Sequence, residues 1–349
     1  MKTALFDYIL PPERIAQKPI RPRDRSRLLV LDPVMETMEH RQFFEIGAYL
    51  TQGDLLVVND TKVFKARLMA RRATGGKVEL FLLRPVEEAK ISSTWECLLK
   101  PGKKVREGDA LVVGRVPFTV LRKNDDGVVV IHAPLSAENV IDFVNRHGTI
   151  PVPPYVGRAP KMLADYQTVY AKKQGSVAAP TAGFHFTPQI IARLKRRGIR
   201  FASVTLHVGI GTFRPVTVAT LEEHEMHAEW GEIPSATLAA IRATKKRKGR
   251  VIAVGTTTVR CLEGLADARV KRGWINIFIT PGYRFRVVDA LITNFHLPRS
   301  TLLALVSAFA GRAFVFRSYA EAINKKYRFY SFGDAMFVMR RVDALRRRG

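Results

Sequence analysis

The stretch "TPQIIARLKRRGIRFASVTLHV", residues 187–208, places a helix directly before a strand. Thr187 fits an N-cap and Pro188 fits the first helical position, where its missing N–H costs nothing. The side chains that this helix would bury are Ile190, Ile191 and Leu194. Residues 199–208 then read as a strand, so the stretch indicates a helix–strand unit of an α/β fold.

The same order recurs later in the chain. Residues 235–249, "SATLAAIRATKKRKG", predict a helix, and "RVIAVG" (250–255) predicts the strand after it. A helix from about Thr257 followed by "INIFI" (275–279) predicts a third pair. "GDLLVVND" (53–60) is a further buried-strand run. Alternation of this kind predicts an α/β domain around a buried, largely parallel sheet.

A segment of different character interrupts this pattern between about residues 64 and 134. Short β-rich runs alternate with turn signals there, and Val78, Leu80 and Leu82 alternate with more polar positions as in a half-buried strand. Closely spaced strands without long helices predict a small antiparallel barrel or sandwich. "SAENVIDFVNRHG" (136–148) then predicts a helix.

These patterns predict two domains. A discontinuous α/β domain is expected to comprise residues 1–62 and 151–349, and a β-rich, barrel-like insert ending in a short helix is expected at 63–150. A chain of 349 residues with 47% hydrophobic residues is long enough for two cores.

Composition narrows the possible partners. Lys and Arg number 57 against 31 Asp and Glu, which gives a formal charge of +26 and a pI of about 10.5. Such a surplus favours polyanions, with nucleic acid first and an anionic membrane surface second, although a merely solvated surface stays open. Two distant cysteines exclude a disulfide framework, and neither a signal peptide nor a membrane span is expected. We therefore expect a cytoplasmic protein.

Polar residues gather where predicted strands end. In open α/β sheets, ligands bind beyond the carboxyl ends of the strands, where helix N-termini attract anionic groups. "LITNFHLPRST" (291–301) would point Asn294 and His296 into such a site while Ser300 or Thr301 caps the next helix. The other stretches of this kind are 57–63, 178–188, 205–213 and 253–260.

Each stretch has a structural alternative. His185 lies between two phenylalanines and fits a buried core histidine as well as a catalyst. "HVGIGTF" (207–213) has one Gly-x-Gly, which suits a turn better than a nucleotide loop. His224 and His227 stand three apart without an obvious third zinc ligand. Arg260 fits either an ion pair or an anion site.

Basic runs follow two of the predicted helices and precede strands. They place Arg196 and Arg197 at the end of one helix, and Lys245, Lys246 and Arg247 at the end of the next. Both runs are therefore expected at the edge of the sheet opposite the polar strand ends. We predict that these five residues contact RNA phosphates.

Taken together, the motifs resemble one family over nearly the whole chain. They include "RDRSRLLVLD", "GDLLVVNDTKVFKARL", "SVAAPTAGFHFT", "VTLHVGIGTFRPV", "EEHEMHAE", "VIAVGTTTVRCLE", "DALITNFHLPRSTLLALVSAFAG" and "YRFYSFGDAMF". This text is similar to the S-adenosylmethionine:tRNA ribosyltransferase-isomerases of queuosine biosynthesis.

The resemblance implies a monomeric, cytoplasmic enzyme of bacterial type. It would transfer and isomerise the ribosyl part of S-adenosylmethionine onto 7-aminomethyl-7-deazaguanine at the wobble position of a tRNA. Epoxyqueuosine-tRNA would form, with release of adenine and methionine. S-adenosylmethionine is then a consumed substrate, the anticodon stem-loop is the partner, and no metal is expected.

Physical chemistry then assigns roles to the polar residues. The sulfonium acidifies the neighbouring carbon, so a neutral histidine, His185 or His207, suits the base, and Glu223 or His224 suits a second proton transfer. Asn294 or His296 would assist the departing adenine, and the amides near Thr256 with Arg260 would hold the methionine carboxylate. The S-adenosylmethionine site is predicted to comprise Thr181, Gly183, Gly209, Gly211, Thr256, Thr257, Arg260, Asn294 and His296.

Three other classes of protein remain possible from the residues alone. A non-catalytic RNA-binding module would explain the charge but not the polar strand ends. An RNA methyltransferase would share both substrates but should carry a glycine-rich loop. A metal hydrolase would use His224 and His227.

Overall fold

The computed structural model describes residues 1–157, 159–160, 162–209, 216–226, 228–265 and 271–340. The chain divides into two compact units. The first comprises Met1–Thr61, Gln167–Lys173 and Pro180–Gly349, and the second comprises Lys62–Tyr166 and Gln174–Ala179. Compared with the boundary predicted at residue 151, the second unit extends further along the chain.

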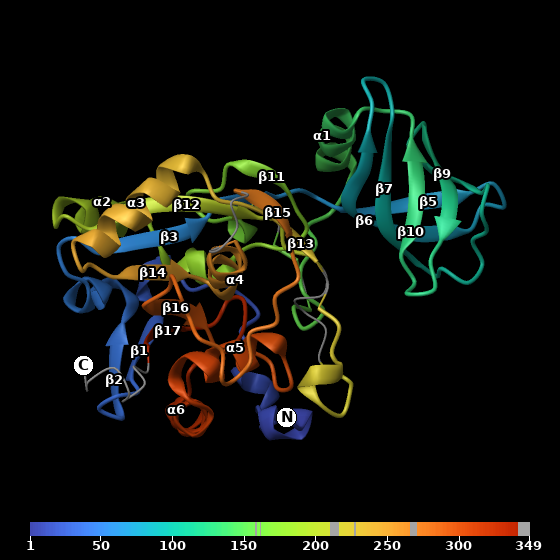
Figure 1. Ribbon diagram of the computed structural model, residues 1–349. Coiled ribbons are helices and arrows are strands. Elements are labelled where there is room, and N and C mark those ends of the chain that lie inside the picture. Colours follow the sequence, from blue (N-terminus) through green and yellow to red (C-terminus); the bar gives the residue numbers. More distant parts are fainter. Residues whose placement is uncertain (158, 161, 210–215, 227, 266–270, 341–349) are drawn as a thin grey trace. The chain divides into compact units, whose positions relative to one another are not determined.

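A nine-stranded mixed sheet organises the first unit (Figure 1). Its strands, in spatial order, are β15 (Arg272–Ile275), β13 (Glu229–Glu232), β12 (Arg200–Leu206), β3 (Leu55–Asn59), β14 (Val251–Val254), β16 (Ala290–Asn294), β17 (Ala335–Met339), β1 (Arg27–Asp32) and β2 (Thr37–Gln42). The four central strands β12, β3, β14 and β16 run parallel, whereas β13, β15, β17 and β2 pair antiparallel with a neighbour. The predicted α/β class with a largely parallel centre is confirmed.

Buried apolar side chains explain the central strands. Every residue of β3 is buried, as expected for a strand covered on both faces. Leu56 and Val58 pack with Ile190 and Leu194 of α2 (Pro188–Arg196) in one core cluster. Helices α3 (Ser235–Lys246) and α4 (Thr256–Gly264) also contact the central strands. The short helices η4 (Phe43–Tyr49) and η6 (Thr181–His185) contribute to the same cluster.

Helix ends follow the predicted capping. The Thr187 hydroxyl accepts a hydrogen bond from the Ile190 amide at 3.3 Å, and the Ser300 hydroxyl accepts one from the Leu303 amide at 3.2 Å. Ser300 thereby begins α5 (Thr301–Ala310), which ends at Gly311 before α6 (Arg312–Asn324). No single helix in the described residues is both long and apolar enough to cross a membrane. The bent pair α5 and α6 meets both criteria only when combined, across a 112° bend.

The third predicted helix–strand pair needs a correction. The helix is present as α4, but residues 276–280 contain no strand, and only Ile275 of "INIFI" belongs to one. The strand that follows α4 in the parallel sheet is instead β16, Ala290–Asn294. Every residue of β16 is buried, whereas β15 pairs at the edge of the sheet and buries only Ile275. Tertiary position therefore overrides the apolar run.

The second unit contains a closed barrel with strand order β10-β7-β6-β5-β8-β9, in which every pairing is antiparallel. Its strands are β5 (Arg67–Arg72), β6 (Lys77–Glu88), β7 (Ser93–Lys100), β8 (Ala110–Val113), β9 (Val116–Lys123) and β10 (Val129–Ala133). Val78, Leu80 and Leu82 face the interior as predicted. Ser136 caps α1 (Ala137–His147), while β4 (Thr61–Val63) and β11 (Lys173–Ser176) pair separately.

A buried carboxylate joins two central strands at the amino edge of the sheet. Asp54 is 1% exposed and pairs with Arg250, whose Nη2 lies 2.6 Å from Oδ2 and whose amide donates to Oδ1 at 3.2 Å. Burial alone raises the pKa of the Asp54 carboxyl, but the hydrogen bonds from Arg250 and Thr51 outweigh it and hold this pKa below its usual range. The pair thus holds the starts of β3 and β14 together.

We predict that Asp54→Ala lowers the free energy of unfolding by about 3 kcal/mol, because it leaves the Arg250 guanidinium and several backbone N–H groups without their partner. The matched control is Asp7→Ala, which removes an exposed pair with Arg299 and should cost about 1 kcal/mol or less. Denaturant unfolding of both variants measures the difference. Equal losses would show that Asp54 holds nothing beyond a surface charge.

Candidate functional site

The carboxyl ends of four adjacent parallel strands form one edge of the sheet. His207 follows β12, Asp60 follows β3, Thr256 follows β14 after one glycine, and Asn294 ends β16. Adjacent strands lie about 4.8 Å apart, so the row from β12 to β16 spans roughly 15 Å. Residues more than 230 positions apart in the chain are therefore aligned along this edge of the sheet.

His185 and Asn294 form a buried polar group at the β16 end of the row. The Asn294 amide donates to His185 Nε2 at 3.2 Å and to the Tyr330 carbonyl at 3.1 Å. His185 Nδ1 lies 2.7 Å from the Ser26 hydroxyl, and the Thr181 hydroxyl lies 3.4 Å from Asn294 Oδ1. Both ring nitrogens of His185 are thus hydrogen-bonded.

Burial keeps the His185 ring neutral. Burial, assisted by the positive charges of Arg328 and Arg23, lowers the pKa of His185 to about 3. The side chain is only 4% exposed and its ring lies 5.1 Å from that of Phe43. His185 therefore fits both interpretations of the sequence. Its ring is part of the core, and it also forms a hydrogen bond with Asn294.

His207 occupies the other end of the row and is less enclosed. Its Nδ1 lies 2.8 Å from the Thr61 hydroxyl, and its ring stacks on Trp230 with centroids 5.5 Å apart. Burial lowers the pKa of His207 to about 4, a shift that nearby Asp60 opposes. Nε2 has no hydrogen-bond partner among the described residues, and it carries a lone pair in the tautomer whose Nδ1–H donates to the Thr61 hydroxyl.

Asn59 joins the elements of the row. Its Oδ1 accepts hydrogen bonds from the Thr61 and Leu206 amides, each at 3.1 Å. Its Nδ2 donates to the Leu206 carbonyl at 2.9 Å and lies 3.4 Å from the Thr257 hydroxyl. One fully buried amide therefore ties β3 to β12 and α4. Asn59 lies in the polar stretch 57–63 but was not predicted as a site residue, although an amide that ends an apolar run signals such a role.

The start of α4 lies between the two histidines. Gly255 precedes it with a φ of 93°, a conformation that favours glycine, and Thr256 and Thr257 are 5% and 7% exposed. Gly183 of η6 packs so closely against Tyr170 that a side chain there would collide with the phenol ring. Thr181, Gly183, Thr256, Thr257 and Asn294 are thus close to this edge through η6, α4 and β16.

Arg260 serves a buried ion pair. Its guanidinium binds the Glu229 carboxylate, and the two side chains are 6% and 5% exposed. The other oxygen of Glu229 accepts a hydrogen bond from the Gly209 amide at 2.9 Å, which ties the loop after β12 to β13. Of the two readings of Arg260, the ion pair is observed. Glu229 was missed because it appears in the sequence as one of several acidic residues.

Other predicted residues lie elsewhere or are engaged. Glu223 ends η8 (Leu221–Glu223) and is exposed, while His224 is half-buried against Phe278, with ring centroids 5.5 Å apart. His296 is buried, its Nε2 lies 2.9 Å from the Thr293 hydroxyl, and burial lowers its pKa to about 3. Gly211 and His227 lie outside the described residues. Within the described part of the chain, no group of three His, Cys, Asp or Glu could hold a metal.

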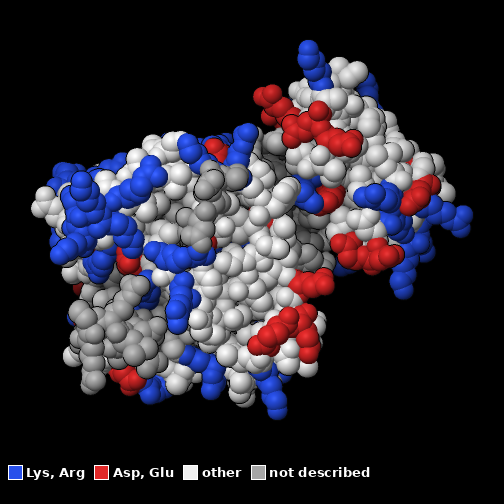
Figure 2. All heavy atoms as spheres, in the orientation of Figure 1, with Lys and Arg blue, Asp and Glu red and all other residues white. Residues whose placement is uncertain are grey.

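The predicted phosphate contacts lie at the opposite edge of the sheet. Arg196, Arg197, Lys246 and Arg247 are exposed at the ends of α2 and α3, immediately before β12 and β14. Figure 2 shows Lys and Arg side chains gathered over this region. Lys245 is bound to Asp289, with its Nζ 2.6 Å from Oδ2.

We predict that Arg260→Ala lowers the free energy of unfolding by about 3–5 kcal/mol, because Glu229 would remain buried without a counterion. The double variant Arg260→Met/Glu229→Gln should lose less than this, since no unpaired charge remains. Denaturant unfolding distinguishes them. An Arg260→Ala protein with wild-type stability and lost S-adenosylmethionine binding would instead assign the guanidinium to the substrate.

The buried neutral histidines also predict a pH dependence of stability. Their folded pKa values lie below the unfolded value of 6.5, so their contribution is complete above pH 6.5 and is lost as pH falls toward 4. The gap in free energy of unfolding between the wild type and His185→Gln should therefore narrow from pH 7 to pH 4.5. A gap that widens toward acid would contradict neutral burial.

The chain is similar to known proteins over almost its whole length. The profile of a family described as queuosine biosynthesis protein matches residues 3–338. Relatives named S-adenosylmethionine:tRNA ribosyltransferase-isomerase from Thermotoga maritima and Moorella thermoacetica are each 49% identical, covering 97% of this chain and 100% of theirs.

A solved structure supports the same assignment. The crystal structure of S-adenosylmethionine tRNA ribosyltransferase from Thermotoga maritima aligns with a TM-score of 0.56 and 40% identity, covering 96% of this chain and 100% of that one. The profile match and the full-length relatives show that this chain belongs to the queuosine biosynthesis protein family, whose similar members carry the name of a transferase.

Proposed function

We propose that this protein transfers and isomerises the ribosyl moiety of S-adenosylmethionine onto 7-aminomethyl-7-deazaguanine at the wobble position of tRNA. Epoxyqueuosine-tRNA forms, and adenine and methionine leave. The observation that carries the proposal is the row of polar residues His207, Asp60, Thr256 and Asn294, with His185 bound to Asn294, at one sheet edge of a chain from this family. The α/β unit carries the chemistry, and the barrel is accessory.

His207 is the better of the two histidine bases. The proton next to a sulfonium is acidified by the positive sulfur, and a neutral imidazole with an unoccupied nitrogen can accept it. His207 Nε2 meets this condition in the tautomer whose Nδ1–H donates to Thr61, with the ring stacked on Trp230. His185 must first release the Asn294 amide. We therefore assign proton removal to His207 and assign His185 to the positioning of Asn294.

The remaining roles follow from what each group can donate. Asn294 assists the departing adenine once one of its two amide protons, donated to His185 and Tyr330, is released. The amides at the start of α4 hold the methionine carboxylate. Arg260 contributes through Glu229 and the Gly209 amide rather than by binding the carboxylate itself. Glu223 and His224 stay assigned to the second proton transfer.

The RNA partner is supported by the charge of +26 and by exposed aromatic surface. Phe295, which follows Asn294, is fully buried and therefore cannot stack on a base of the RNA. Trp274 is 54% exposed and pairs with Trp230 across β13 and β15. Trp230 in turn stacks on the His207 ring. This pair is better placed to stack on an unpaired base of the anticodon stem-loop. We propose that the reaction takes place in the cytoplasm, where tRNA is found. We also propose that the protein acts as a monomer.

We expect incubation with S-adenosylmethionine and tRNA carrying the deazaguanine to release free adenine and to add an epoxide-bearing ring to the RNA, detected by mass spectrometry. His207→Gln should reduce the turnover at saturating tRNA by about a hundredfold or more, the usual contribution of a general base. His132→Gln in the barrel is the matched control and should keep wild-type turnover. Formation of S-adenosylhomocysteine would indicate a methyltransferase, and full activity of His207→Gln would remove that residue from the mechanism.

A further inference from the structure

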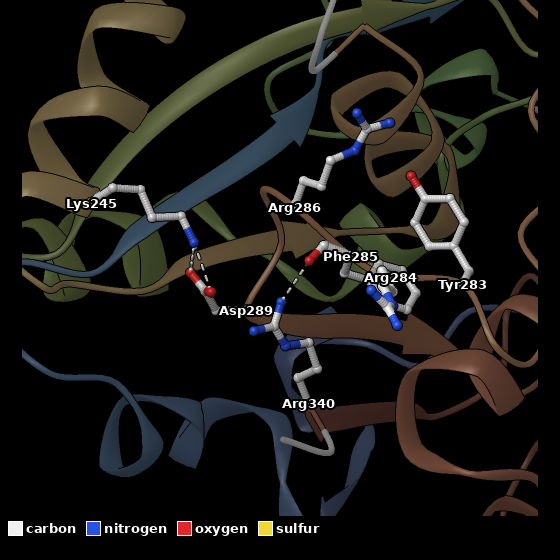
Figure 3. Close-up of a pocket in the computed structure, with 7 residues that line it drawn as sticks. All are labelled: Lys245, Tyr283, Arg284, Phe285, Arg286, Asp289 and Arg340. Carbon is white, nitrogen blue, oxygen red and sulfur yellow. Dashed lines mark hydrogen bonds and ion pairs between the residues drawn. The ribbon is translucent and has the colours of Figure 1, made fainter. Parts of the chain in front are cut away.

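Strand β16 fixes the backbone of Asn294 but not the direction in which its side-chain amide points. The strand pairs with β17 up to Asn294 itself, which lies opposite Ala335. Its start is anchored by Asp289, which accepts the Val251 amide at 2.8 Å and binds Lys245 Nζ at 2.6 Å (Figure 3). A carboxamide has a donor side and an acceptor side, so the strand leaves two orientations open, related by a half-turn.

The backbone carbonyl of Tyr330 decides between these two orientations. Asn294 Nδ2 lies 3.1 Å from this carbonyl oxygen, and a carbonyl can only accept a hydrogen bond. In the reversed orientation two oxygens would face each other. The Thr181 hydroxyl is compatible with the first orientation, because it can donate to Asn294 Oδ1 at 3.4 Å. The NH2 group of Asn294 therefore faces Tyr330 and also His185 Nε2, which lies 3.2 Å away.

The orientation of Asn294 in turn determines the tautomer of His185. Burial lowers the pKa of His185 to about 3, so near neutral pH the ring carries one N–H and one lone pair. Because Nε2 accepts the Asn294 amide, it carries the lone pair and the proton is on Nδ1. This Nδ1–H lies 2.7 Å, measured between heavy atoms, from the Ser26 hydroxyl oxygen. Ser26 is therefore the acceptor in this hydrogen bond.

The Ser26 oxygen is held in a fixed place. Ser26 lies between η3 (Arg23–Arg25) and β1 and is 1% exposed. Its amide donates to the Arg23 carbonyl at 3.3 Å, and its carbonyl accepts the Phe43 amide at 2.8 Å. The Phe43 ring also packs on the His185 ring. Among the described residues, no second group accepts a hydrogen bond from His185 Nδ1.

We propose that Ser26 is a positioning residue of the reaction, because by accepting the Nδ1–H of His185 it holds the tautomer whose Nε2 keeps the Asn294 amide oriented. The proposal rests on the proposed function, in which Asn294 assists the departing adenine. Without the Ser26 oxygen, a buried N–H would lose its acceptor, which favours transfer of the proton to Nε2. Two N–H groups would then face each other between His185 and Asn294, and the amide would turn or move away.

The first test is the tautomer, read by nitrogen-15 NMR of histidine-labelled protein, with the His185 signals assigned by their loss in His185→Gln. The wild type should carry the proton on Nδ1, and Ser26→Ala should move it wholly or partly to Nε2. The matched control is Ser93→Ala in the barrel. It removes a serine oxygen that is also buried and accepts a ring N–H, that of Trp95 at 2.9 Å, and it should leave the His185 signals unchanged. A wild-type proton on Nε2, or an unchanged tautomer in Ser26→Ala, would overturn the proposal.

The second test is the rate of adenine release at saturating S-adenosylmethionine and tRNA. Ser26→Ala should lower kcat by about tenfold to a hundredfold, the usual cost of a misplaced group, and change KM much less, since Asn294 acts on the leaving adenine. Ser26→Thr keeps the hydroxyl and should recover both the tautomer and most of the turnover, while Ser93→Ala should keep wild-type kcat.

The remaining outcomes separate this proposal from the proposed function. A changed tautomer with wild-type turnover would overturn the positioning role, as would a loss in Ser26→Thr equal to that in Ser26→Ala, which would assign the effect to packing. A wild-type protein that releases no adenine would overturn the proposed function, and the NMR signals would still report whether Ser26 holds the tautomer.

Discussion

Parallel pairing of β12, β3, β14 and β16 brings the chemistry of this protein together. A parallel sheet aligns the ends of its strands, so one polar residue placed after each strand joins a common row. Asn59 stabilises this row, because its side-chain amide forms hydrogen bonds with groups of β12 and α4. A buried amide left without these partners would cost more than an apolar side chain, so the network also selects one register of β3 against β12.

The two ends of these parallel strands carry side chains of different chemistry. At the carboxyl edge burial lowers the pKa values of His185 and His207, which suits proton transfer, and Arg260 is paired with the buried Glu229. At the amino edge Arg196, Arg197, Lys246 and Arg247 are exposed at the ends of α2 and α3.

The fold could largely be predicted from local patterns, but the site could be predicted only in part. Helix caps at Thr187 and Ser300 were readable because they depend on neighbouring residues. The prediction of the strand after α4 was wrong. "INIFI" and β16 are both apolar, and only their tertiary positions distinguish them. Arg260 could be read in two ways until its partner was visible. Asn59, Glu229 and Ser26 act through residues distant in sequence, which no local pattern reveals.

The outermost strands of the sheet carry a consequence for self-association. An unpaired strand edge is a template on which another copy can add a strand, and such additions lead to aggregation. β15 is only four residues long and starts with Arg272, and β2 carries Glu39, His40 and Arg41 in sequence. The short length of β15 and the charged side chains of β2 disfavour the addition of a further strand. The barrel is closed, so its six strands leave no unpaired strand edge.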